Sequence, residues 1–253
     1  VGSEMCIRDS YFFYEVSYRL GSTNITKWAA ALGLTTKTNI ELPSESTSFV
    51  GNQAMLYDPD VSIQQQQTDK PKITAAMIKK LFLRVGADRG IEYDDDRLNE
   101  VAKSILDIVI TYDSKSEWLP AIRDILLYDM NLPRNYIASH FMVNTINTYL
   151  NDLKWTPAET IMAGIGQSIT QVTPIAVARY TAAIANGGTV YDAQIIDKVI
   201  DADGNIVVQK EPVVANQIVT SQAYFDAIHE GMEEVTSTEN DGTAAAQFAK
   251  SRY

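Results

Sequence analysis

Hydrophobic residues recur at helical spacing through most of the first 154 residues. Residues 12–34 are predicted to form two short helices around a turn at 21–24, because apolar positions three and four apart occur on each side of it. Residues 73–154 are predicted to be helical throughout, with a first helix at 74–84 and three more after it. We expect these four helices to pack their apolar stripes on one another as a helical subdomain. The three later stripes are Leu98, Val101, Ile105, Ile108 and Val109; Leu119, Ile122, Ile125 and Leu126; and Ile137, Phe141, Thr145 and Tyr149.

Two less regular segments lie between the helical regions. Residues 35–45, TTKTNIELPSE, contain an Ile-Glu-Leu alternation ended by Pro43, which predicts a short strand followed by a loop. From Ser44 to about Lys72 polar residues dominate, so this stretch is predicted to be a long surface connection.

Residues 163–190 predict a helix between a glycine turn and a strand. Thr173 can cap the helix, and Pro174 suits its first position because that position needs no N–H donor. The glycines after Asn186 favour a left-handed C-terminal cap. A narrow face of small side chains is expected to lie close against a neighbouring element; it comprises Ile175, Ala178, Ala182 and Ala185.

The rest of the chain predicts strands and one more helix. A β-rich run follows the glycines, and two further runs flank Asp203-Gly204, which is a strong hairpin signal. Residues 221–235 are predicted to form an amphipathic helix whose apolar face contains Tyr224, Ile228 and Met232.

Composition narrows the classes of partner. The 253 residues are 45% hydrophobic, which is typical of a folded globular protein. A net charge of -11 argues against nucleic acid and against an anionic membrane surface as partners. The chain has no apolar run of about 18 residues and no signal-peptide pattern at its start. Its single cysteine, Cys6, excludes an internal disulfide and a multi-cysteine metal site.

Two acidic segments have both a metal-binding and a structural interpretation. IDADGNI, residues 200–206, resembles part of a calcium loop, but the final bidentate acid is missing and the flanks are β-rich, so a hairpin turn is favoured. Asp94–Asp96 with Glu92 could bind a divalent ion, whereas negative side chains at a helix start explain the cluster more simply. Neither a metal nor a cofactor is predicted.

Histidines and hydroxyls are the candidate catalytic groups. His140 and His229 each lie in a predicted helix without a second ligand at metal spacing, so packed or solvated side chains are favoured over catalytic bases. Ser168, Thr170 and Thr173 form a hydroxyl cluster, but no adjacent lysine or histidine could activate a nucleophile, so a structural use is favoured. The residues alone therefore predict no self-contained catalytic site.

Five segments taken in order resemble a known family. They read FFYEVSYRLG, ALGLTTKTNIELPSE, GIGQSITQVTPIAVARYTAAIANGGTVYDAQIIDKV, IHEGMEEV and DGTAAAQF. This series resembles the transpeptidase domain of class B penicillin-binding proteins over residues 11–45 and 155–248. The resemblance implies an α+β transpeptidase fold, like that of serine β-lactamases, with an antiparallel sheet flanked by helices. Residues 46–154 would be a linker and helical insertion, and residues 155–253 the truncated second part of the domain.

The family's catalytic motifs are not matched in this chain. By resemblance, a Ser-x-x-Lys supplies the nucleophile and its activating lysine, while a Ser-x-Asn and a Lys-Thr-Gly line the cleft. The Ser-x-Asn positions fall on Arg8, Asp9 and Ser10, so Ser10 stands where the family has asparagine. The Lys-Thr-Gly is expected shortly after GTAAAQF, where the sequence continues only to Tyr253, and no Ser-x-x-Lys is found in family context. No catalytic residue is therefore assigned.

Residues 1–10, VGSEMCIRDS, resemble no part of the family and look like a translated adapter or fusion scar. On this hypothesis Cys6 is an artefact, and the natural reading frame is expected to have Ser and Asn at positions 8 and 10, with a Ser-x-x-Lys and a membrane anchor upstream. Two other departures from the family are smaller: Asn39 and Ser168 stand where glycine is common, and asparagine tolerates the left-handed conformation.

The resemblance also implies a site, a function and partners. Gly166, Gln167 and Thr173 would be scaffold residues of a substrate groove. The full-length protein would cross-link peptidoglycan stem peptides and bind β-lactams at the extracytoplasmic face of a bacterial membrane, and divisome or elongasome proteins would be further partners. The 253 residues alone are expected to be inactive. Two alternatives remain: a non-catalytic module that binds peptidoglycan or a divisome partner, and a β-lactamase or antibiotic-sensor relative.

Overall fold

The computed structural model describes residues 10–239 and 242–250, which form two compact units. Unit 1 contains the chain up to Gly51 and the chain from Pro157 onward, and unit 2 is the segment Asn52–Thr156 between them. Cys6, Arg8 and Asp9 lie outside the described residues. The predictions made for them, and the role of residues 46–154 as an insertion, stay predictions.

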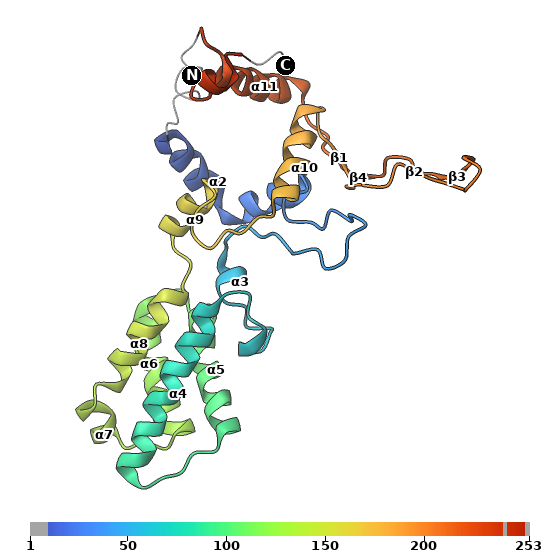
Figure 1. Ribbon diagram of the computed structural model, residues 1–253. Helices are drawn as coiled ribbons and strands as arrows, with labels where there is room; N and C mark the ends of the chain where they lie inside the picture. Colours follow the sequence, from blue (N-terminus) through green and yellow to red (C-terminus); the bar gives the residue numbers. More distant parts are fainter. Residues whose placement is uncertain (1–9, 240–241, 251–253) are drawn as a thin grey trace. The chain divides into compact units, whose positions relative to one another are not determined.

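Unit 2 is built almost entirely of helices (Figure 1). Its fold begins with α3 and a short 3-10 turn, and the longer helices follow in sequence order. The elements are α3 Gln53–Leu56, η1 Ile63–Gln65, α4 Asp69–Arg89, α5 Asp95–Thr111, α6 Lys115–Asp124, the π-helical turn η2 Ile125–Asp129, α7 Arg134–Ser139, α8 Met142–Leu150 and η3 Asn151–Leu153. The structure thus has five α-helices between residues 69 and 150, where the sequence predicted four.

One continuous hydrophobic core holds unit 2 together. All five residues of the first predicted stripe are buried on α5, from Leu98 to Val109, which confirms that prediction. From the second stripe Ile122 and Leu126 are buried, and the fully buried Trp118, which the pattern missed, lies beside them. Trp118 is accommodated because its indole N–H donates to the Tyr112 carbonyl at 3.2 Å.

The third predicted stripe is wrong at its centre. Phe141 has a left-handed backbone, with φ 51°, and ends α7 before α8 begins. This break shifts the helical register, so Phe141 is 70% exposed while Met142, Ile146 and Leu150 become the buried face of α8. A constant period cannot anticipate such a break, because the stripe continues only if the helix does.

Residues 44–72 are not the surface connection that their polar composition predicted. They contain α3 and η1, and Tyr57 within them is fully buried. The Tyr57 hydroxyl donates to the Asp107 carboxylate of α5 at 2.5 Å, and the Lys103 ammonium contacts the same carboxylate at 3.0 Å. Burial, followed by the hydrogen bond to Asp107, raises the pKa of the Tyr57 phenol above its ordinary value. The half-buried Asp107 and Lys103 of α5 therefore tie this segment to the core through the buried Tyr57.

A single side chain joins the two ends of unit 2. The Gln53 amide nitrogen donates to the Leu153 carbonyl at 2.9 Å, and its amide oxygen accepts from the Trp155 N–H at 2.8 Å. One glutamine therefore fastens α3 to the chain that follows α8.

Unit 1 combines helices with short antiparallel strands. Its first helix, α2 Ser10–Ala31, is two helices merged across a kink at Gly21, where φ is 75°; this confirms the predicted pair. The other elements are α9 Pro157–Gly164, α10 Pro174–Ala185, β1 Thr189–Tyr191, β2 Lys198–Ile200, β3 Ile206–Gln209, β4 Val214–Gln217, α11 Gln222–Thr236 and α12 Ala245–Phe248.

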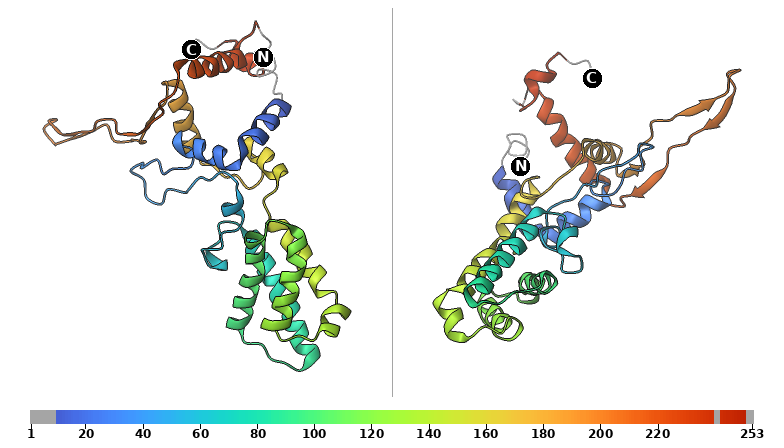
Figure 2. Two further views of the ribbon diagram at one scale, coloured as in Figure 1. Left: turned by 180° about the vertical axis from the view of Figure 1, so that it is seen from behind. Right: turned by 60° about the horizontal axis from the view of Figure 1, so that its bottom comes forward.

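The strands pair as two separate antiparallel ribbons. β1 pairs with β4, and β2 pairs with β3 through the predicted turn at Asp203-Gly204. Figure 2 shows the β2–β3 hairpin at the far end of the arm that β1 and β4 begin. Helices and antiparallel strands together give the predicted α+β class, and α10 packs beside β1. β4 had no counterpart among the sequence predictions.

The strand predicted within residues 35–45 does not form. Asn39 and Ser44 have left-handed backbones, with φ 56° and 62°, and residues 41–44 form bends, so no regular strand forms here. Irregular contacts replace a ladder here: the Ala193 N–H donates to the Thr38 carbonyl at 2.8 Å, and the Ile195 N–H donates to the Glu41 carboxylate at 2.9 Å. The left-handed Asn39 agrees with its expected tolerance of that conformation.

Two predicted helices form, but each buries a different face from the one expected. In α10, Ala178, Ala182 and Ala185 are exposed, and the buried positions are Ala176, Arg179, Ala183 and Ile184. In α11, Tyr224, Ile228 and Met232 are exposed, and Phe225 is buried instead. The apolar pattern located both helices, whereas their neighbours decided which face is covered.

Buried Arg179 explains the face that α10 covers. Its guanidinium donates to the Lys37 carbonyl at 2.6 Å and to the Thr36 hydroxyl at 2.7 Å, across from the end of α2. Gly33 makes room for it, because a Cβ there would lie 2.7 Å from Arg179 Nε and the backbone φ is +83°. Arg179 thus ties the chain after α2 to α10.

Among the described residues, no helix is both long enough and apolar enough to cross a lipid bilayer.

Candidate functional site

The predicted scaffold residues lie on the chain between α9 and α10. Gly166 follows the end of α9 and has φ 76°, a conformation that glycine adopts without a Cβ penalty. The Gly166 N–H donates to the Ala163 carbonyl at 3.0 Å, and the Gln167 N–H donates to the Met162 carbonyl at 2.9 Å. These bonds satisfy the last carbonyls of α9 and turn the chain toward α10.

Thr173 begins α10 and also holds a second segment. Its hydroxyl accepts from the Ala176 N–H at 3.3 Å, which confirms the predicted cap. Its own N–H donates to the Ser48 hydroxyl at 2.9 Å, and the two hydroxyl oxygens lie 3.3 Å apart. Sequence reasoning missed Ser48, because no local signal links two residues that are 125 positions apart.

The other two hydroxyls of the cluster also have structural partners. The Thr170 hydroxyl accepts from the Gly51 N–H at 3.0 Å, next to an isolated bridge between Phe49 and Gln171. The Ser168 hydroxyl donates to the Glu159 carboxylate, and its backbone has φ 62°. The structure therefore joins residues 48–51 to 170–173. Each of the three hydroxyls thus makes a structural contact, as the sequence favoured: Thr170 and Thr173 with backbone groups and Ser48, and Ser168 with Glu159.

An apolar groove of about 350 Å³ lies beside this junction. Both halves of α2, the end of α9 and one side of α10 line it, with Trp28, Val50 and Val177 among the larger side chains and Gly166 and Thr170 at its edge. Burial raises the pKa of Tyr180, which also faces the groove. The lining offers neither a base nor a cation, so the groove is suited to apolar binding rather than to proton transfer.

The histidines occupy structural positions. His229 on α11 contacts the Ile184 carbonyl through Nε2 at 2.8 Å, at the last turn of α10, where a ring N–H can satisfy a free carbonyl. His140 stacks on Tyr136, with ring centroids 4.0 Å apart, and its Nδ1 lies 3.0 Å from the Tyr136 carbonyl. These contacts agree with the packed or solvated roles that the sequence favoured.

The acidic segments follow their structural interpretations as well. Asp94 caps α5 by accepting from the Arg97 N–H at 3.3 Å, and Asp95 and Asp96 lie in the first turn. In the hairpin, the Asp201 carboxylate accepts from the Asp203 N–H at 3.0 Å and from the Asn205 N–H at 2.8 Å. The Asn205 hydrogen bonds lower the pKa of Asp201. The predicted helix start and hairpin turn are therefore confirmed.

Comparison with known proteins finds similarity in the later part of the chain. Residues 142–253 match the family model described as the penicillin binding protein transpeptidase domain. A stretch of 94 residues is 33% identical to "Penicillin-binding protein 2A" of Bacillus subtilis (strain 168); it covers 35% of this chain and 13% of that protein. The family match includes the GIGQ turn, α10 and the strands, whereas the resemblance of residues 11–45 stays a prediction.

Proposed function

We propose that this chain, whose residues 142–253 match the penicillin binding protein transpeptidase domain, belongs to a class B peptidoglycan D,D-transpeptidase. In that reaction a serine oxygen attacks the carbonyl of the penultimate D-alanine and the terminal D-alanine leaves. The amine of a second stem peptide then displaces the serine and forms the cross-link. A β-lactam acylates the same serine.

The family match over residues 142–253 carries this proposal. The local structure supports it, since α9, the glycine turn, α10 and β1 follow in the order of the sequence resemblance, with α10 packed beside β1. We propose Gly166, Gln167 and Thr173 as scaffold residues, because they shape the turn and the start of α10.

The 253 residues alone are proposed to be inactive in acyl transfer. No serine in the sequence has a lysine three positions later, so no Ser-x-x-Lys is present to supply the nucleophile and its base. Lys-Thr-Gly is likewise absent from the sequence. Stem peptides, β-lactams, partner proteins of cell division or elongation and a location at the outer face of the membrane are proposed for the full-length protein only.

Labelling with a fluorescent penicillin tests the proposal. The 253-residue chain is expected to form no covalent adduct, whereas the product of the complete natural reading frame is expected to be acylated once, at a serine in Ser-x-x-Lys. An adduct on the 253 residues would show that they contain a nucleophile and would overturn the inactive role.

Further measurements on the full-length protein separate the two alternatives. A full-length protein without Ser-x-x-Lys that binds peptidoglycan would be a non-catalytic module. Rapid turnover of a chromogenic cephalosporin by the full-length protein, without a lasting adduct, would identify a β-lactamase relative. Either result would replace the transpeptidase proposal.

A further inference from the structure

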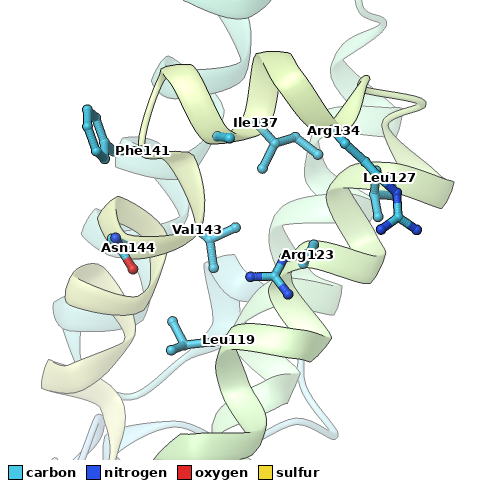
Figure 3. Close-up of a pocket in the computed structure, with 9 residues that line it drawn as sticks. Leu119, Arg123, Leu127, Arg134, Ile137, Phe141, Val143 and Asn144 are labelled. Carbon is cyan, nitrogen blue, oxygen red and sulfur yellow. The ribbon is translucent and has the colours of Figure 1, made fainter.

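Unit 2 contains a pocket that its hydrophobic core leaves open. The pocket has a volume of about 310 Å³, at the lower end for ligand sites, and lies among α6, η2, α7 and α8 (Figure 3). Leu119, Leu127, Ile137 and Val143 provide apolar surface from four of these elements. Figure 3 shows Leu119 and Val143 on neighbouring sides of the open space. The walls can therefore hold a large apolar side chain.

Two arginines line the same pocket. Arg123 extends from α6 into the open space, and Arg134, which is the first residue of α7, also lines it (Figure 3). Within the described part of the chain, neither guanidinium makes an ion pair or a hydrogen bond. Two other arginines of unit 2 are engaged: Arg97 bonds to Glu100 and to the Asp129 carbonyl, and Arg89 lies over the Tyr136 ring. Arg123 and Arg134 are therefore available to an external anion.

The backbone around the pocket departs from regular helix in two places. The π-helical turn η2, which is a rare conformation frequent at functional sites, carries Leu127 into the wall. Phe141 has a left-handed backbone that a bulky residue seldom adopts, and it holds a 70% exposed ring on the side opposite Arg134 (Figure 3). Residues 10–239 and 242–250 leave most of that ring uncovered. A bound apolar group would cover it.

We propose that this pocket binds an acidic peptide segment of a partner protein. One carboxylate of the segment would lie between Arg123 and Arg134, since a guanidinium binds a carboxylate through two parallel hydrogen bonds. An adjacent large apolar side chain would pack on Leu119 and Val143 and against the Phe141 ring. The binding is non-covalent and does not depend on the transpeptidase assignment.

Charge and shape favour a peptide over a membrane. Unit 2 has 15 acidic and 12 basic side chains, so its net charge of -3 would oppose docking on an anionic bilayer. The site is a concave pocket of about 310 Å³, the size of one or two side chains, rather than an extended basic face. Two local positive charges on an acidic unit select a discrete anionic group.

Fluorescence anisotropy with a labelled peptide tests the proposal on the whole 253-residue chain. The probe is fluorescein-labelled Ala-Glu-Leu-Leu-Glu-Ala, compared with the same peptide carrying Gln in place of Glu and with one carrying Ala in place of Leu. We expect the first peptide to bind and the other two to have affinities about tenfold or more lower. The Gln peptide lacks the carboxylates that the arginines would bind, and the Ala peptide lacks the leucine side chains that the apolar walls would cover.

Arginine variants assign the binding to this pocket. Arg123→Gln combined with Arg134→Gln is expected to weaken binding of the acidic peptide about tenfold or more. Arg84→Gln is the matched control, because Arg84 is an exposed arginine on α4 of the same unit and does not line the pocket. Phe141→Ala removes an exposed ring without emptying the core and is expected to weaken binding as well.

Several outcomes would overturn the proposal. They are no binding of the acidic peptide up to about 1 mM, equal binding by the double arginine variant, and an equal loss in Arg84→Gln. Arginine-dependent sedimentation with phosphatidylglycerol vesicles in the absence of peptide binding would identify a membrane instead. Amide hydrogen exchange across α6 to α8 checks that each variant remains folded. If the double arginine variant unfolds there, the peptide affinity of Phe141→Ala decides the proposal instead.

Discussion

Unit 2 covers its hydrophobic residues far more completely than unit 1 does. Of the 30 large hydrophobic side chains exposed in the described residues, 24 lie in unit 1 and six in unit 2. Unit 2 has one continuous core that runs from Tyr57 to Leu153, and the Gln53 amide joins its ends. In unit 1 the elements are joined by individual contacts, such as the hydrogen bonds of buried Arg179 and the close approach of Ser17 to Gly164.

This difference shows that a similar apolar content can be stabilised in two ways. Helices at regular spacing provide enough complementary faces to close a core within one continuous segment, as α4, α5, α6 and α8 do. Unit 1 assembles from segments far apart in the sequence, so particular polar contacts and particular glycines position its elements. The first kind of unit should respond most to cavities and the second most to crowding.

The largest expected effect is a cavity in the core of unit 2. Leu106→Ala on α5 is expected to lower the local free energy of unfolding by about 2–5 kcal/mol, because Leu106 is fully buried and its neighbours can only partly fill the space. Leu83→Ala on α4 is the matched control and should change stability by less than about 0.5 kcal/mol, because that leucine is largely exposed. Amide hydrogen exchange resolved by peptide measures both units separately; equal effects of the two variants would contradict a closed core.

Crowding between α2 and α9 should produce the next largest effect. A Cβ at Gly164 would overlap the Ser17 side chain, so Gly164→Ala is expected to destabilise this contact by about 1–3 kcal/mol. Ser17→Gly removes the atoms that the new methyl meets, and the double variant should therefore lose less than the sum of the two single variants. Hydrogen exchange of α9 measures each variant. Strictly additive losses would show that the close approach does not limit stability.

The smallest expected effect tests a polar anchor of unit 2. Tyr57→Phe removes the hydrogen bond to Asp107, while Lys103 remains paired with that carboxylate, and the expected loss is about 1–2 kcal/mol near neutral pH.

The same anchor should make stability fall at alkaline pH. The pKa of Tyr57 is raised in the folded protein, whereas an unfolded phenol ionises near pH 10. Its contribution is therefore complete below about pH 10 and is lost as the pH rises above that value. Urea unfolding from pH 8 to 11 should show a steeper alkaline loss for the natural protein than for Tyr57→Phe, because all other tyrosines are shared. Parallel curves would exclude Tyr57 as the source.

Local signals in the sequence were reliable where a nearby interaction forms the structure. The α5 stripe, the Thr173 cap, the Asp94 helix start and the Asp203-Gly204 turn all depend on residues within a few positions of each other. The candidate site followed the same rule. The sequence located the GIGQ turn and its three hydroxyls but could not identify Ser48, which reaches Thr173 from a distant segment.

The sequence by itself determined most of the longer helices, the caps at Asp94 and Thr173 and the hairpin at Asp203-Gly204, because these depend on backbone preferences and short-range periodicity. Only the tertiary structure decided that Phe141 breaks a helix, that Tyr57 is buried and that α10 covers Arg179 instead of its alanine face. Those outcomes depend on which distant side chain offers a partner for a buried hydroxyl, guanidinium or methyl group. Periodicity along the chain does not contain that information.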